Sequence, residues 1–66
     1  MKTQIEVLID KPVVMIHHNG DSIAQVVGTL QKENYNFYTV GEGRTTSQFF
    51  SWDVSYIEDN RIHIGE

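Results

Sequence analysis

The residues that build ordinary α-helices are almost absent from this chain of 66 residues. Alanine occurs once and leucine twice, whereas valine and isoleucine occur seven times each. β-Branched and aromatic side chains suit a pleated, half-buried surface, and helices of normal length need more alanine, leucine and glutamate. The composition therefore predicts an all-β domain with at most a short N-terminal helix.

The length of the chain adds a second constraint. The sequence is short enough for a single domain, and it contains no cysteine, so no disulfide can stabilise it. Domains below about 70–80 residues usually depend on disulfides, metals, very tight packing or a partner subunit. We therefore expect one domain over residues 1–66 that associates with copies of itself.

Alternating apolar residues and turn residues divide the chain into strands. Five strands are predicted, over residues 13–18, 22–30, 35–40, 45–51 and 54–57, and residues 61–64 are compatible with a short last strand. Asn19-Gly20 predicts a hairpin turn, Gly28 predicts a bulge or sharp bend, and residues 31–34 predict a polar turn. Residues 3–9 fit either one or two helical turns or an edge strand. The expected fold is a strongly bent five-stranded antiparallel sheet in the form of a small open barrel.

The charge balance excludes some classes of function. The chain has 5 basic and 9 acidic residues and a net charge of −4, which argues against coating nucleic acid by charge alone but leaves room for a small site that reads a few bases. No apolar run approaches the length of about 20 residues that a membrane span needs, and no signal-peptide pattern opens the sequence. We expect a cytoplasmic protein without membrane contact.

The histidines and acidic residues do not form a recognisable reactive pattern. His17 and His18 are adjacent on a predicted strand and so point to opposite faces, and His63 is distant in sequence, so no converging set of metal ligands is expected. No spacing supports a nucleophile beside a base, and no glycine-rich loop opens a helix. We therefore predict no catalysis, no cofactor and no metal, with all three histidines in ordinary structural or surface roles.

Two short segments are candidates for binding. In Asn34-Tyr35-Asn36-Phe37, strand alternation places the two amides on one face, where they can hydrogen-bond base edges; the alternative is that the asparagines cap a turn and the aromatic residues fill the core. In Ser51-Trp52-Asp53, a lone tryptophan lies between closely spaced strands. It can stack on an unpaired base, plug the end of the barrel or anchor a subunit contact.

Taken in order, these segments resemble the Sm-like family, including its bacterial Hfq branch. The stretch from Lys11 to Gly20 is similar to the first strand and turn glycine of the family, and the pieces similar to its two motifs are Gly28-Thr29-Leu30, Asn34-Tyr35-Asn36-Phe37 and Phe49 to Ser55. The resemblance covers residues 11–58. The second motif departs from the family, because Ser51-Trp52 stands where the family carries Arg-Gly or Lys-His.

The resemblance implies subunits joined edge to edge in a homo-oligomeric ring, here of about five to seven copies, that binds single-stranded RNA near its pore. It assigns Asn34 and Asn36 to the third loop of the site and Ser51 and Trp52 to the fifth, and Lys32 would add a basic group to the pore rim. The rival interpretation is an acidic protein-interaction module, such as an inhibitor that mimics nucleic acid, which the net charge of −4 favours.

Overall fold

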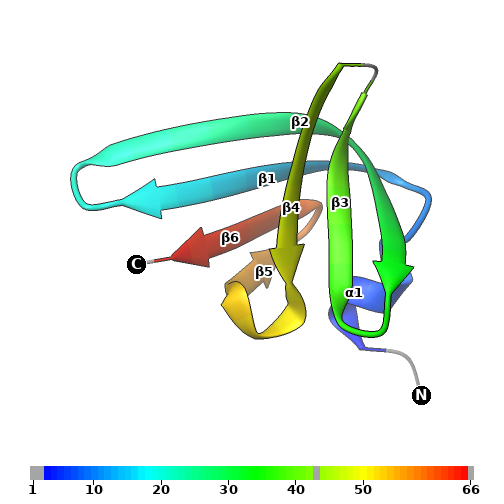
Figure 1. Cartoon of the computed structure of the whole chain (residues 1–66). Coiled ribbons are helices and arrows are strands. Elements are labelled where there is room, and N and C mark those ends of the chain that lie inside the picture. Colours follow the sequence, from blue (N-terminus) through cyan, green and yellow to red (C-terminus); the bar gives the residue numbers. More distant parts are fainter. Residues whose placement is uncertain (1–2, 43, 66) are drawn as a thin grey trace.

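The computed structural model describes residues 3–42 and 44–65 and is mostly β, with one short α-helix (Figure 1). The elements are α1 (Gln4–Val7), β1 (Pro12–Asn19), β2 (Ser22–Asn34), β3 (Phe37–Glu42), β4 (Thr45–Phe50), the 3-10 helix η1 (Ser51–Asp53), β5 (Val54–Glu58) and β6 (Arg61–Gly65). The prediction of an all-β domain with a short N-terminal helix is confirmed.

The N-terminal segment, for which two conformations were open, forms the single turn α1. The Thr3 hydroxyl accepts a hydrogen bond from the backbone N–H of Glu6 (3.3 Å), and the Glu6 carboxylate accepts one from the backbone N–H of Thr3 (3.2 Å). This reciprocal capping box satisfies donors that a short helix otherwise leaves exposed. Ile5 is buried and attaches the helix to the core.

The sheet has six strands in the order β4-β3-β2-β1-β6-β5. All neighbouring strands are antiparallel except β1 and β6, which run parallel from Val14 beside Arg61 to His18 beside Gly65. The predicted five-stranded antiparallel sheet is therefore wrong, and the sheet is open rather than closed into a barrel. The reason is that β6 takes the free edge of β1 and β5 folds back onto β6, so β5 remains an edge strand.

The long strand β2 belongs to two half-sheets, one that continues through β1 and one that continues through β3. Its first part pairs with β1 as far as Thr29, and its second part pairs with β3 from Thr29 onward (Figure 1). A Cβ on Gly28 would stand 2.5 Å from the Cα of Gly41, so only glycine permits the close approach of the two backbones at this bend. The prediction of a sharp bend at Gly28 is confirmed.

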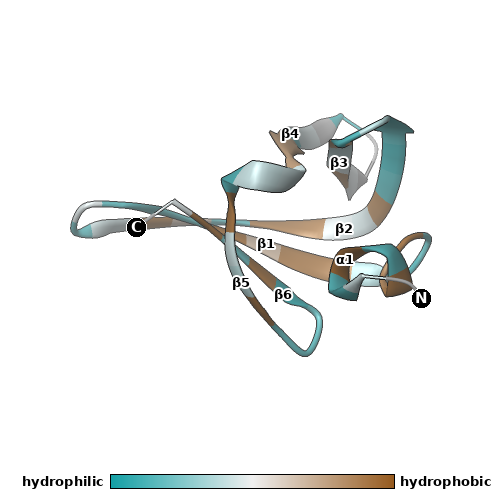
Figure 2. Cartoon of the chain, turned by 90° about the horizontal axis from the view of Figure 1, so that it is seen from below, coloured by the Kyte–Doolittle hydropathy of each residue, from teal (hydrophilic) through white to brown (hydrophobic). Residues whose placement is uncertain are grey.

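The polar turn predicted at residues 31–34 is wrong, because these residues continue β2 beyond the bend. Gln31 and Lys32 pair with Thr39 and Tyr38 of β3, and a register shift follows between Lys32 and Asn34. Figure 2 shows this hydrophilic end of β2 arching between the two half-sheets. The polar side chains of this end face solvent, while its backbone groups form hydrogen bonds with β3.

The turn of the β1–β2 hairpin lies one residue later in the sequence than predicted. Asn19 pairs with Ser22, so the central residues of the turn are Gly20 and Asp21 rather than Asn19 and Gly20. Of these two central residues, Gly20 has a positive φ, of 63°, and Asp21 does not, which is the pattern of a type II′ turn.

The core lies inside the fold of the two half-sheets. Its fully buried side chains are Val13, Leu30, Val40 and Ile62. Although β4 and β5 are the two edges of the sheet, only the three residues of η1 join them in the chain. The sheet therefore curls until both edges approach η1, and this places the β2–β3 turn, the end of β4 and η1 at one end of the molecule (Figure 1).

Candidate nucleic-acid interface

Two hydrogen bonds hold the β2–β3 turn against η1. The backbone N–H of Ser51 donates to the carbonyl oxygen of Asn36 (2.7 Å), and the Ser51 hydroxyl donates to Oδ1 of the same asparagine (3.0 Å). On the other side of η1, the Asp53 carboxylate accepts a hydrogen bond from the backbone N–H of Phe50 (3.0 Å). The position of η1, and with it the position of Trp52, is therefore set by contacts at both ends.

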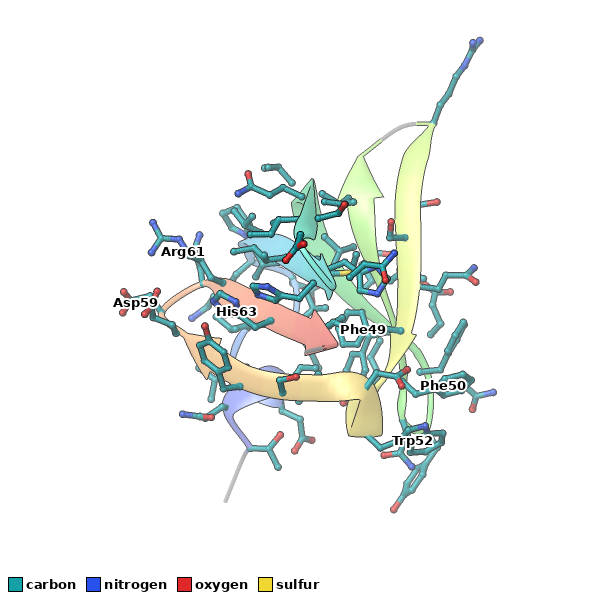
Figure 3. The ribbon with its side chains drawn as sticks, turned by 90° about the vertical axis from the view of Figure 1, so that its left-hand side faces the viewer. Phe49, Phe50, Trp52, Asp59, Arg61 and His63 are labelled. Atoms are coloured by element: carbon teal, nitrogen blue, oxygen red, sulfur yellow. The ribbon has the colours of Figure 1, made fainter. Side chains whose placement is uncertain are left out.

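Three aromatic rings, which we call the aromatic platform, lie beside this junction. Phe37 packs against Phe50 with ring centroids 4.9 Å apart, and Phe50 stacks on Trp52 at 4.8 Å with an interplanar angle of 4°. The Trp52 side chain is 68% exposed. Figure 3 shows Phe50 and Trp52 together at this end, whereas Phe49 points toward the interior. The platform thus presents a large aromatic surface to solvent.

The platform forms one wall of a shallow cavity of about 450 Å³. The remaining wall comes from Asn34, Tyr35 and Asn36 of the β2–β3 turn. A cavity of about 550 Å³ lies on the other side of Tyr35 and Asn36 and extends toward α1 and β5. Lys32 lines this second cavity, with its Nζ 5.7 Å from the centroid of the Tyr35 ring.

The structure brings the five predicted site residues to one end of the molecule. Asn36 and Ser51 are in contact, Asn34 and Trp52 line the same cavity, and Lys32 lines the neighbouring one. The predicted arrangement of the two asparagines on one strand face is wrong, because Asn34 ends β2 and Asn36 lies in the turn before β3.

The two aromatic residues between these asparagines also differ from expectation. The alternative that both aromatic residues fill the core does not hold for Tyr35, which is 81% exposed, and Phe37 is only half-buried. Both differences have one cause. Since β2 extends through Asn34, the turn falls on Tyr35 and Asn36, and β3 begins at Phe37. Tyr35 is therefore at the tip of a turn rather than inside a strand.

Sequence reasoning missed Phe50 as a member of the site. Strand alternation puts Phe49 and Phe50 on opposite faces of β4, and their exposed fractions are 3% and 41%. An outward phenylalanine two residues before an outward tryptophan is a signal that the sequence carried, because adjacent exposed aromatic side chains tend to pack on one another.

The basic residues are widely separated. Lys32 lies at the candidate interface, Arg44 lies in the connection between β3 and β4 at the far end of these strands, and Arg61 is paired with Glu58 at 3.2 Å. Within the described ranges, no cluster of three or more histidine, aspartate or glutamate side chains has the proximity of a metal site. The interface is therefore aromatic and amide-rich, with one lysine beside it.

Comparisons with protein-family models, with curated proteins and with solved structures found no significant match. Neither helix in the described part of the chain has the length and apolar character that crossing a membrane requires.

Proposed function

We propose that this protein is an Sm-like, ring-forming module that binds single-stranded RNA and performs no catalysis. The observation that carries the proposal is the exposed indole of Trp52, stacked on Phe50 and flanked by the amides of Asn34 and Asn36. An aromatic surface beside amide groups offers both contacts that an unpaired base uses, which are stacking and hydrogen bonding along its edge.

The electrostatic setting suits weak binding of short strands. With a net charge of −4, the chain as a whole repels phosphate, and Lys32 is the basic side chain at the interface. Stacking therefore has to supply most of the affinity of each subunit. Several copies of the site in one ring would increase the overall affinity, because the sites would bind one strand together.

The ring is supported by the two edges of the open sheet. Strands β4 and β5 each have one unpaired side, and an unpaired strand edge is a template for a strand of a second copy. Since the two edges belong to different strands, pairing β4 of one copy with β5 of the next gives a head-to-tail contact, which closes into a ring when the rotation allows it.

RNA titrations test the binding site. Trp52→Ala should weaken binding of short uridine-rich or adenine-rich single strands by about 1–3 kcal/mol per stacked base, measured by fluorescence anisotropy, while circular dichroism stays unchanged. Asn36→Ala should also weaken binding, and Asn19→Ala, at the far end of β1, is its matched control. Unchanged affinity in both Trp52→Ala and Asn36→Ala would refute the site.

Native mass spectrometry tests the assembly separately. The expected result is one closed species of about five to seven subunits. A stable monomer at micromolar concentration would contradict the ring, whatever the RNA titrations show. Loss of the ring in Trp52→Ala would instead make Trp52 a subunit contact and remove it from the binding site.

The acidic interaction module is the second candidate, favoured by the net charge of −4. Five of the described acidic residues lie on separate elements or connections, however. Glu58 is paired with Arg61 and Asp53 caps η1. Three further aspartates lie in separate connections: Asp10 before β1, Asp21 between β1 and β2, and Asp59 between β5 and β6. A nucleic-acid mimic needs such charges in a regular row, so RNA binding is the better supported function.

A further inference from the structure

The two asparagines at the candidate interface both have their side-chain oxygen engaged within the chain. Oδ1 of Asn34 accepts a hydrogen bond from the backbone N–H of Tyr35 (2.8 Å), and Oδ1 of Asn36 accepts one from the Ser51 hydroxyl (3.0 Å). Because a backbone N–H can only donate, the bond at Asn34 fixes which end of that amide is the oxygen. In each amide, the end that these bonds leave for a ligand is therefore Nδ2, which carries two N–H donors.

The cavity of about 450 Å³ between this turn and the aromatic platform is consequently lined mainly by donors. Asn34 and Asn36 both line it, and so does Trp52, whose indole N–H is a donor with no acceptor function. Tyr35 also lines the cavity, and its hydroxyl can take either role. Among the described residues that line this cavity, none carries a carboxylate. The cavity therefore suits a planar ligand whose edge offers hydrogen-bond acceptors.

The four bases of RNA differ in how well they match such a wall. Guanine carries two adjacent acceptors, O6 and N7, on one edge, with no donor between them. Adenine has an amino donor beside N7, and cytosine has an amino donor at C4. Uracil offers the O4 acceptor, but the N3–H donor stands next to it on its pairing edge. A wall of N–H donors therefore matches the O6 and N7 edge of guanine better than any edge of the other three bases.

The aromatic platform favours the same base. Trp52 is 68% exposed and stacks on Phe50 with an interplanar angle of 4°, and both rings lie at this end of the molecule (Figure 3). A purine has two fused rings, so it covers more of an aromatic surface than a pyrimidine does. Stacking therefore favours guanine and adenine over the pyrimidines, and hydrogen bonding separates guanine from adenine.

We propose that this cavity selects guanine in single-stranded RNA. The base stacks on the aromatic platform, and the Nδ2 groups of Asn34 and Asn36 donate to its O6 and N7 edge. This inference rests on the proposed RNA-binding function and adds the identity of the preferred base. Strands of uridine or adenosine bind through stacking, and one guanine in such a strand raises the affinity.

Fluorescence anisotropy with a set of matched strands tests the selection. Each strand is a short oligouridine in which one central position is replaced by guanosine, inosine, 7-deazaguanosine, adenosine or cytidine. The guanosine strand should bind about tenfold more tightly than the unreplaced strand, which is the gain that a pair of hydrogen bonds to a base edge supplies. Inosine keeps O6 and N7 and should match guanosine. 7-Deazaguanosine lacks N7 and should bind more weakly than guanosine, and adenosine and cytidine should gain less than about threefold.

Two isosteric variants test the role of the amides. Asn34→Asp and Asn36→Asp keep the oxygen that accepts from Tyr35 or Ser51 and replace Nδ2 by a second oxygen. The added charge weakens the binding of all strands alike, so the measured quantity is the ratio of the affinity for the guanosine strand to that for the uridine strand. This ratio should fall from about ten to about one in each variant, because a carboxylate oxygen cannot donate to O6 or N7. Asn19→Asp adds the same charge at the far end of β1 and should keep the wild-type ratio.

The outcomes distinguish this inference from the proposed function. A ratio that falls in both interface variants and persists in Asn19→Asp supports the guanine site. If the wild type binds the guanosine and uridine strands equally, or if Asn34→Asp and Asn36→Asp keep the wild-type ratio, the guanine site is overturned while RNA binding stands. If the wild type binds none of the strands, the guanine site and the proposed function are both overturned.

Discussion

The molecule contains two clusters of stacked rings with opposite relations to solvent. The aromatic platform of Phe37, Phe50 and Trp52 lies at the end of the sheet, and Trp52 is 68% exposed. The cluster of Tyr56, His63 and His18 lies across β5, β6 and β1, and its central ring is 8% exposed. Both clusters use short ring contacts, but only the second joins strands that are distant in the sequence.

The difference shows what each cluster contributes. Around the platform, the backbone is already held by the bonds of Ser51 and Asp53, so the rings can remain exposed for a ligand. In the histidine cluster, the contact between His18 and His63 itself links β1 to β6. We expect substitutions near the first cluster to change binding more than stability, and substitutions near the second to do the reverse.

The largest effect on stability should come from the core side of β6. Ile62, the neighbour of His63, is fully buried, and Ile62→Ala should lower the free energy of unfolding by about 2–5 kcal/mol. The control is Ile23→Ala, whose side chain is 60% exposed and whose loss should change stability by less than about 0.5 kcal/mol. Urea unfolding measures both. Similar losses in the two variants would mean that β6 is not an integral part of the core.

The next effect concerns the bend that separates the two clusters. Gly28→Ala places a Cβ against the backbone of Gly41, and neither backbone can move without breaking strand pairing. We expect a loss of about 1–3 kcal/mol in the free energy of unfolding. The exposed neighbour Val27→Ala should change it by less than about 0.5 kcal/mol. An unchanged urea midpoint in Gly28→Ala would show that the two half-sheets do not depend on this close approach.

A smaller effect is expected at the junction that supports the platform. Ser51→Ala removes the hydroxyl that donates to Oδ1 of Asn36, and should cost about 0.5–1.5 kcal/mol of stability. Because this bond also positions η1, the near-ultraviolet circular dichroism of Trp52 should change. A spectrum identical to that of the wild type would mean that the backbone bond from Ser51 to Asn36 holds η1 by itself.

The smallest effect on stability should come from Lys32. The ammonium group contacts the exposed ring of Tyr35, so Lys32→Gln should change the free energy of unfolding by less than about 0.5 kcal/mol. If Lys32 contacts phosphate, RNA binding by Lys32→Gln should release about one counterion fewer. The slope of log affinity against log salt concentration should then fall by about one. Anisotropy titrations at several salt concentrations measure this slope, and an unchanged slope would place Lys32 outside the RNA path.

Several features of the fold and of the candidate site were predictable from local sequence. Alternation placed Phe49 and Phe50 on opposite faces, and Gly28 predicted a bulge or sharp bend where the structure has a close approach of two backbones. The grouping of Asn36 with Ser51 was expected only from the resemblance to the Sm-like family, which assigns both residues to binding loops, and the two side chains are in contact. The functional consequences of that resemblance are the proposals that the RNA and assembly experiments test.

Other features depended on pairing partners that local patterns do not specify. Residues 31–34 look like a turn because they are polar, yet they continue β2, since β3 satisfies their backbone groups. That extension moved Tyr35 out of the core and onto the tip of a turn. The short segment at residues 61–64 was compatible with a strand, but its parallel pairing with β1 could not be predicted, because nothing local determines which strand takes the free edge of β1 or in which direction it runs.

The sequence by itself therefore determined the all-β class, the opposite faces of Phe49 and Phe50, and the special role of Gly28, because each of these depends on propensity and short-range sterics. The tertiary structure decided which strand lies beside β1. Because β6 pairs with β1, the sheet remains open and β5 is an edge strand. The same pairing brings His18 within hydrogen-bond distance of His63. Its physical reason is the burial of Ile62 and Ile64 in one core with Val13 and Met15, which brings together chain segments that are distant in the sequence.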